Sequence, residues 1–167
     1  MLWQRQIGFR GIVLNSFLLV LGFTIWRATL NNYAKEVFDI TASQIGIIQA
    51  VREVPGLLGF TVGMFALVFS ELRIATMSLA LTGAGLVMIG LADSVLMLGI
   101  GTVVMSVGFH YVVSSNYSLL LHFIKGPESG RRQGTMSSWD AVAGFAGTLI
   151  VFLMALVVGY RVILIST

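Results

Sequence analysis

The sequence contains no cysteine, and it is poor in charged residues and in proline. Without cysteine, disulfides, thiolate nucleophiles and sulfur-ligated metals are excluded. Charged residues make up 10% of the 167 residues and proline contributes 2, whereas hydrophobic residues reach 57%. A soluble domain of this length cannot bury so much apolar surface, so the composition excludes a water-soluble fold.

The apolar residues gather into runs long enough for helices to cross a bilayer. A hydrocarbon layer of ~30 Å takes about 20 helical residues, whereas the strands of a barrel would alternate apolar and polar residues. The sequence therefore predicts an all-α integral membrane protein, a single bundle of about five transmembrane helices within residues 1–167. The predicted spans are 11–30, 45–69, 74–92, 95–123 and 136–158, and 159–167 is predicted to start a further helix.

Basic residues in the predicted loops indicate the orientation of the bundle. Most of them fall on one side of this topology: Arg5, Arg10, Arg73, Lys125, Arg131 and Arg132. The other side carries Lys35 and Arg161. Because cytoplasmic loops carry the excess of Lys and Arg, we expect a cytoplasmic N-terminus in a cell membrane, inner or plasma, with lipid around the bundle. These loop residues account for most of the net charge of +3, so the basic excess does not indicate nucleic-acid binding.

Several ionisable side chains fall inside the predicted spans, and the ones that stand out are Arg27, Arg52, Glu53 and His110. Each costs at least ~2.5 kcal/mol at membrane depth unless it has a partner, a water-filled cavity or a function. At about 1.5 Å per residue, Arg27 and Glu53 reach similar heights on antiparallel helices. The sequence therefore predicts an ion pair between them, with Arg52 either facing the same cavity or extending outward to the membrane surface. The alternative is that Arg27 only extends to the membrane surface.

Polar and small residues recur at helical spacing along these spans. The stripe in 45–69 consists of Gln49, Arg52, Glu53, Gly56, Gly59 and Gly63. Gly59 and Gly63 form a G-x-x-x-G pattern, which lets a neighbouring backbone come close, and Pro55 should bend the helix. Such stripes have a plainer interpretation as helix-packing faces, which accounts for glycine and serine but not for arginine, glutamate and histidine.

The last predicted span, 136–158, has a stripe of its own that begins with Asp140. We expect Ser137 or Ser138 to cap this helix and Asp140 to lie in its first turn, because these residue types favour helix N-termini.

The sequence offers no catalytic constellation. It has no G-x-S-x-G elbow, and no second histidine lies at membrane depth to work with His110. His110 and His122 are twelve residues apart, without a His pair at i, i+4 or a carboxylate cluster, so no metal site is predicted. We therefore predict neither an enzyme nor a bound cofactor.

Several sequence segments carry a likeness to a transporter family. They are GFTIWRATLNNYA closing 11–30, QIGIIQAVREVPGLLG opening 45–69, the charge-free 74–92, MSVGFHYVVSSNYSLLL in 95–123 and a basic loop before WDAVAGFAGTLI. In this order of features the chain resembles the N-terminal half of a major facilitator superfamily transporter, over roughly residues 8–167. Two family features are replaced. ALVFSELRIATMS stands in place of the usual G-x-x-x-D-x-x-G-[RK]-x-[RK] loop, and Val104 stands where proton-coupled drug exporters often have arginine.

The resemblance implies a secondary active transporter, truncated before or within the sixth helix, that moves a small solute by alternating access of two bundles. Its partner is then the missing C-terminal half or a second copy of the chain. The implied solute contacts are Arg27, Gln49, Arg52, Glu53, His110, Tyr111 and Asn116. The arginines suit an anionic group, and His110 or Glu53 could take up a proton. The alternatives are a complete five-span protein and a non-transporting membrane assembly or interaction protein.

Overall fold

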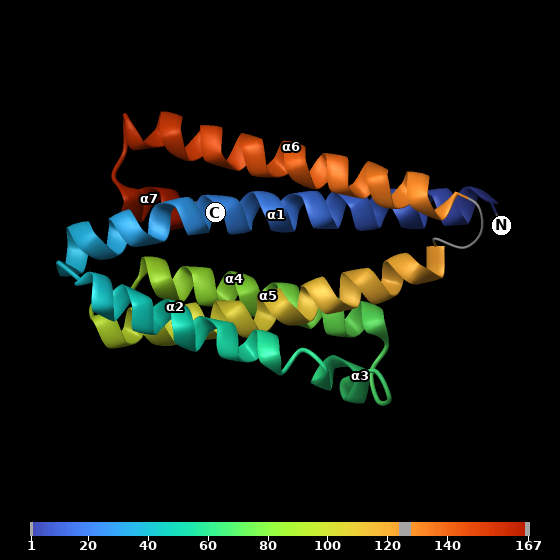
Figure 1. The fold of residues 1–167 in the computed structure, drawn as a ribbon, viewed down its shortest axis with the longest axis horizontal. Coiled ribbons are helices and arrows are strands. Elements are labelled where there is room, and N and C mark those ends of the chain that lie inside the picture. Colours follow the sequence, from blue (N-terminus) through green and yellow to red (C-terminus); the bar gives the residue numbers. More distant parts are fainter. Residues whose placement is uncertain (1, 124–127, 166–167) are drawn as a thin grey trace.

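The computed structural model describes residues 2–123 and 128–165, and within them every regular element is a helix. The helices run along one common axis, connected by short turns (Figure 1). Their bounds are α1 Leu2–Phe38, α2 Ala42–Leu57, α3 Thr61–Phe65, α4 Glu71–Gly90, α5 Val95–Phe123, α6 Ser129–Ala155 and α7 Tyr160–Ile165.

Four helices of the described chain are long and apolar enough to cross a membrane. They are α1 over Gly8–Phe38, α4 over its whole length, α5 over Val95–Leu121, and α6 over its whole length. Large apolar side chains on their outer faces are bare, for example Phe145 and Phe152 of α6, which are 72% and 63% exposed. An exposed apolar surface of this kind is stable in contact with lipid acyl chains and not with water. The chain is therefore a multi-pass helical membrane protein.

The segment 45–69 differs from the single helix that the sequence predicted. α2 ends at Leu57, tighter turns follow in which Leu58 and Thr61 bond to carbonyls three residues back, and α3 is short. Pro55 lacks the N–H of a helix interior, and the glycines around it favour helix weakly, which explains the break. A Cβ at Gly63 would meet nothing within 4 Å, so no backbone of the described chain approaches the G-x-x-x-G pattern closely at that position.

Two other helix ends also lie outside their predicted places. α1 continues past Leu30 to Phe38, and Lys35 near its end donates a hydrogen bond to Asp39, which lowers the pKa of that carboxyl. α6 begins at Ser129, not near residue 136, so the predicted cap at Ser137 or Ser138 is wrong. Part of the expected loop 125–134 is therefore helical, and its residues 125–127 lie outside the described part of the chain. As a result, Asp140 moves from the first turn to the interior of its helix.

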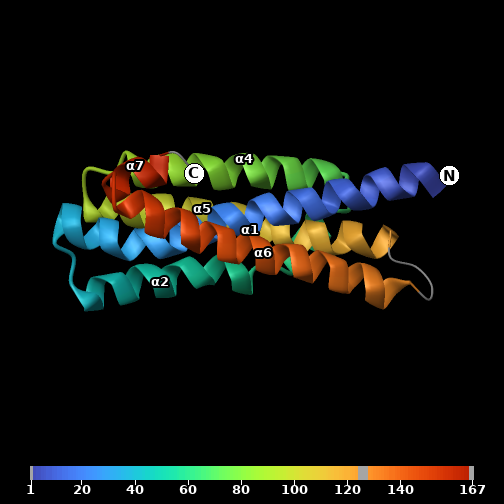
Figure 2. The same cartoon turned by 90° about the horizontal axis from the view of Figure 1, so that it is seen from above.

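α5 is the helix around which the bundle is organised. It packs along α4 and also contacts α1 and α2, whereas α6 packs on α1 (Figures 1 and 2). Gly108 makes the α4–α5 approach possible, because a Cβ there would lie 2.4 Å from the backbone nitrogen of Thr82 and 2.5 Å from the carbonyl oxygen of Ser78. The short α7 packs on α1 and α4.

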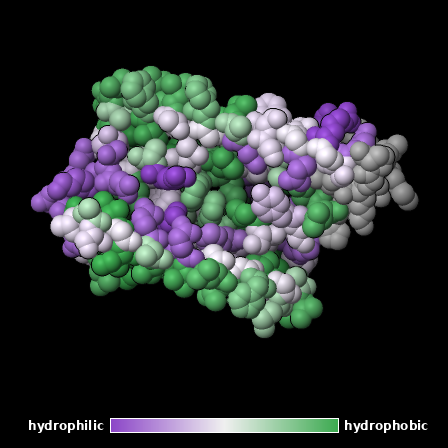
Figure 3. All heavy atoms as spheres, in the orientation of Figure 1, coloured by the Kyte–Doolittle hydropathy of each residue, from purple (hydrophilic) through white to green (hydrophobic). Residues whose placement is uncertain are grey.

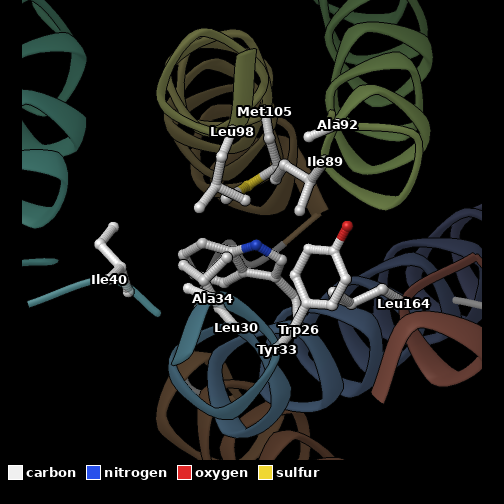
Figure 4. Close-up of a cluster of buried hydrophobic side chains, with 10 residues drawn as sticks. All are labelled: Trp26, Leu30, Tyr33, Ala34, Ile40, Ile89, Ala92, Leu98, Met105 and Leu164. Carbon is white, nitrogen blue, oxygen red and sulfur yellow. The ribbon is translucent and has the colours of Figure 1, made fainter. Parts of the chain in front are cut away.

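The main apolar core lies near the end of the bundle where α1 finishes. Trp26, Leu30 and Tyr33 of α1 point towards Leu98 and Met105 of α5, with residues of α4 and α7 beside them (Figure 4). Trp26 and Tyr33 are fully buried. This core fixes α1 against α5, and it thereby positions the polar side chains that lie between α1, α2 and α5.

Candidate functional site

A charged cluster lies between α1, α2 and α5, near the middle of the membrane-spanning length. His110 is close to the centre of the 29-residue α5, ~22 Å from its first residue at 1.5 Å per residue. Figure 3 shows that this face of the molecule is hollowed between α1 and α2, with hydrophilic side chains gathered beside the hollow. The cluster is therefore at a depth where an unpaired charge is costly.

Three ionisable side chains form the cluster. The guanidinium of Arg52 donates a hydrogen bond to the carboxylate of its neighbour Glu53, and the two form an ion pair. Nε2 of His110 lies 3.8 Å from the other carboxylate oxygen of Glu53. The side chain of Arg52 is only 17% exposed, whereas that of Glu53 is 56% exposed. Glu53 thus links a half-buried histidine and a largely buried arginine at the rim of the hollow.

Aromatic rings of α1 hold Arg52 in place. Its Cζ lies 5.3 Å from the ring centroid of Trp26 and 5.9 Å from that of Phe23, distances at which a cation is attracted to a ring face. Phe23 in turn stacks on Phe109 of α5 at 4.1 Å. Nε of Arg52 is buried and has no hydrogen-bond partner in the described chain. The guanidinium therefore keeps one donor free.

Two contacts bring α2 close to α5 at this point. The hydroxyl of Ser106 donates a hydrogen bond of 2.5 Å to the backbone carbonyl of Arg52. The imidazole of His110 packs against α2 at Gly56, where a Cβ would come within 2.8 Å of the ring. A residue without a side chain is therefore needed at position 56 for His110 to reach Glu53.

The structure does not bring Arg27 into this cluster. Arg27 is exposed, and the described residues contain no ion pair between it and Glu53, which pairs with Arg52 instead. The predicted Arg27–Glu53 pair is therefore wrong. The reason is that an adjacent residue on the same helix satisfies Glu53, and α2 packs mainly on α5 and not on α1.

The remaining predicted contacts lie in three places. Gln49 is half-buried one turn before Arg52 on α2. Tyr111 lines a separate apolar groove beside α3 and α4, and its hydroxyl hydrogen-bonds to that of Thr61. Asn116 instead faces α1, where its Oδ1 accepts a hydrogen bond of 2.8 Å from Nδ2 of Asn15. Asn116 therefore belongs to a second polar site.

This second site contains residues that the sequence did not single out as solute contacts. The hydroxyl of Ser16 donates a hydrogen bond of 2.8 Å to a carboxylate oxygen of Asp140 on α6. A cavity of about 80 Å³ between α1, α5 and α6 is lined by Ser16, Asn116, Tyr117 and Asp140, together with apolar side chains. The sequence predicted that α6 starts near residue 136, which put Asp140 in its first turn. With the observed start at Ser129, Asp140 is a carboxylate in the helix interior.

No family model matches this chain, and no curated protein gives a significant match to it. The resemblance to major facilitator transporters therefore remains a prediction from the order of sequence features.

Proposed function

We propose that the chain is part of a secondary active transporter of the major facilitator type, which moves a small anionic solute across a cell membrane by alternating access. The observation that carries this proposal is the cluster of Arg52, Glu53 and His110 beside a hollow at mid-membrane depth. Ionisable side chains at this depth are rare, and in membrane proteins they mark solute and proton pathways.

The state of Arg52 supports an anion as the solute. A guanidinium has five donors, and Nε of Arg52 has no partner among the described residues. A solute carboxylate or phosphate can replace the more exposed Glu53 as the partner of the guanidinium, so that Arg52 remains neutralised. The aromatic rings of Phe23 and Trp26 keep the cation in place during the exchange.

His110 gives the same cluster a route for coupling to protons. Once a solute displaces Glu53 from Arg52, the freed carboxylate lies beside His110, whose Nε2 is already 3.8 Å away. A proton on the imidazole would then give Glu53 a new partner of opposite charge. Solute binding would thereby favour proton uptake, which is the thermodynamic requirement for cotransport.

The remaining elements of the proposal are the orientation and the second bundle. The helices alternate in direction, so Arg10, Arg73 and Arg131 all lie at the same end of the bundle, where we place the cytoplasm. Alternating access needs a second bundle to rock against this one, so the proposed partner is a C-terminal half or a second copy of the chain.

Thermal stabilisation of the purified chain in lipid nanodiscs tests the proposal. A panel of small carboxylates, phosphates and sulfate should contain a class that raises the melting temperature, because a ligand that binds the native state stabilises it. Arg52→Gln should abolish that rise, whereas the matched control Arg73→Gln, at an exposed position, should keep it.

Two results would contradict the proposal: a panel in which no anion stabilises the protein, or a stabilisation that survives Arg52→Gln. The first of these would favour the alternative, a non-transporting assembly protein whose polar faces contact partner helices. An anion that passes the test can then be followed as radiolabelled uptake into proteoliposomes that contain both bundles.

A further inference from the structure

The cavity between α1, α5 and α6 is a second polar site at membrane depth, separate from the Arg52 cluster. It measures about 80 Å³, and its polar lining consists of Ser16, Asn116, Tyr117 and Asp140. Asp140 lies inside the 27-residue α6, ~16 Å from its first residue at 1.5 Å per residue. Ser16 and Asn116 are both buried, at 8% and 7% exposure. Ser16 and Asn116 are therefore withdrawn from the surface of the bundle, whereas Asp140 is half-buried and Tyr117, at 53% exposure, lies at the rim of the cavity.

The hydrogen bonds of the site leave oxygen atoms available inside it. Ser16 donates to one carboxylate oxygen of Asp140, and the other oxygen has no partner in the described chain. Asn15 donates to Oδ1 of Asn116, an acceptor that has room for a second bond. With the hydroxyl oxygen of Ser16, the cavity offers a carboxylate, an amide carbonyl and a hydroxyl. Oxygen ligands of this kind suit a hard cation.

The charge of Asp140 is the observation that points to a ligand. Within the described residues no basic side chain forms an ion pair with Asp140, in contrast to Glu53, which pairs with Arg52. One hydroxyl donor does not neutralise a carboxylate, and a charge at this depth costs at least ~2.5 kcal/mol. A bound cation would remove that cost.

The charge and the oxygen atoms of the site indicate which kind of cation it would bind. The site contains one carboxylate and otherwise neutral oxygens, and the described residues contain no group of three or more His, Cys, Asp or Glu that could hold a metal. A single negative charge balances a monovalent ion and not a divalent one. The cavity of about 80 Å³ is larger than the ≈ 30 Å³ that one water occupies in the liquid, so an ion with one or two waters fits.

We infer that Ser16, Asn116 and Asp140 form a binding site for a small monovalent cation of the Na⁺ type. This site is independent of the proposed transport function, because it requires neither an anionic solute nor a second bundle. Asp140 supplies the charge, Ser16 and Asn116 supply neutral oxygens, and the packing of α6 against α1 brings Asp140 to Ser16.

The test uses the purified chain in nanodiscs at constant ionic strength, with NaCl replacing choline chloride. The melting temperature should rise with the Na⁺ concentration and saturate, and ²²Na⁺ should bind at one ion per chain. Asp140→Asn should abolish both signals, since it removes the charge but preserves the shape of the side chain. Ser16→Ala should weaken Na⁺ binding several-fold. The matched control Asp93→Asn removes an exposed carboxylate between α4 and α5, and it should leave both signals unchanged.

Three results would overturn the inference. One is a melting temperature that rises no more with NaCl than with choline chloride. Another is a Na⁺ response that persists in Asp140→Asn. The third is a failure of ²²Na⁺ to bind at any pH at which the protein is folded, the result expected if Asp140 keeps a proton. The folded state of each variant is checked by circular dichroism and by its own cooperative melting transition, so that a loss of Na⁺ response is separated from a loss of fold.

Discussion

The two polar sites share α5 but handle their charge in opposite ways. At the Arg52 cluster, the carboxylate of Glu53 has an arginine and a histidine as neighbours, so the charges balance within the protein. At the second site, the carboxylate of Asp140 has one hydroxyl donor and no ion pair among the described residues. The Arg52 cluster is therefore electrostatically complete within the protein, whereas the Asp140 site is incomplete without the proposed cation. Substitutions at the two sites should therefore change stability with opposite signs.

The largest effect is expected from the scaffold that both sites share. Gly108→Ala places a Cβ 2.4 Å from a backbone atom of α4, which cannot move aside as a side-chain tip can. We expect a loss of about 3 kcal/mol in the free energy of unfolding, and failure of both anion and Na⁺ stabilisation together. The matched control is Gly83→Ala on α4, where a Cβ meets nothing within 4 Å. A Gly108→Ala protein as stable as this control would show that α4 and α5 do not pack as described.

The complete site should be destabilised when one partner is removed. Glu53→Gln leaves Arg52 largely buried without a counter-charge, so we expect a loss of about 2 kcal/mol in the free energy of unfolding. Chemical denaturation in nanodiscs or mild detergent measures this difference. Glu36→Gln, at an exposed position near the end of α1, should change it by less than about 0.5 kcal/mol. Equal stabilities for the two variants would mean that the ion pair does not support the fold.

The incomplete site should respond in the other direction. In buffer without Na⁺, Asp140→Asn removes an uncompensated charge and keeps a group that can still bond to Ser16. We expect a gain of about 1 kcal/mol in the free energy of unfolding, which should shrink or reverse as Na⁺ is added to both proteins. A loss of stability without Na⁺ would contradict the comparison, because it would show that the protein already compensates Asp140.

The smallest effect on stability is expected at Gly56, although its effect on the cluster is specific. Gly56→Ala pushes the His110 ring away from α2, and a side chain can shift at a cost of about 1 kcal/mol or less. The separation of His110 and Glu53 should increase, and a proton-dependent response to anions should be lost while anion binding to Arg52 remains. Gly46→Ala on the same helix meets nothing within 4 Å and should keep the response. An unchanged response in Gly56→Ala would exclude His110 from coupling.

Composition and periodicity predicted most of the helices of this molecule, because in lipid the backbone polar groups must bond to one another within a helix or a closed barrel. Long apolar runs had to become helices, which placed α5 at its observed bounds and put Arg52, Glu53 and His110 at membrane depth. The partner of Glu53 was wrong, since helical spacing cannot show whether a carboxylate bonds to its own neighbour or crosses to another helix. The break after Leu57 depends on how Pro55 and the glycines act together, and such local competition is weakly encoded in a hydrophobic pattern.

The Asp140 site was missed as a solute or ion site for a related reason. Its position depends on where α6 begins, and the charged sequence 125–134 resembles a loop although much of it is helical. With the helix start placed seven residues too late, Asp140 became a surface residue of a first turn. Its contact with Ser16 joins residues 124 positions apart in the chain, which no local pattern predicts.

The central claim is that the polar side chains between α1, α2 and α5 border water and not lipid. Because the chain has no cysteine, single cysteines can be introduced without any background reaction. Gln49→Cys lies on the polar stripe of α2, whereas Ile47→Cys lies on the same helix in an apolar groove and is the more exposed position, with the native Ile47 61% exposed. In native membranes, a charged, membrane-impermeant thiol reagent should modify Gln49→Cys and spare Ile47→Cys. Modification of Ile47→Cys alone, or of neither, would contradict the account.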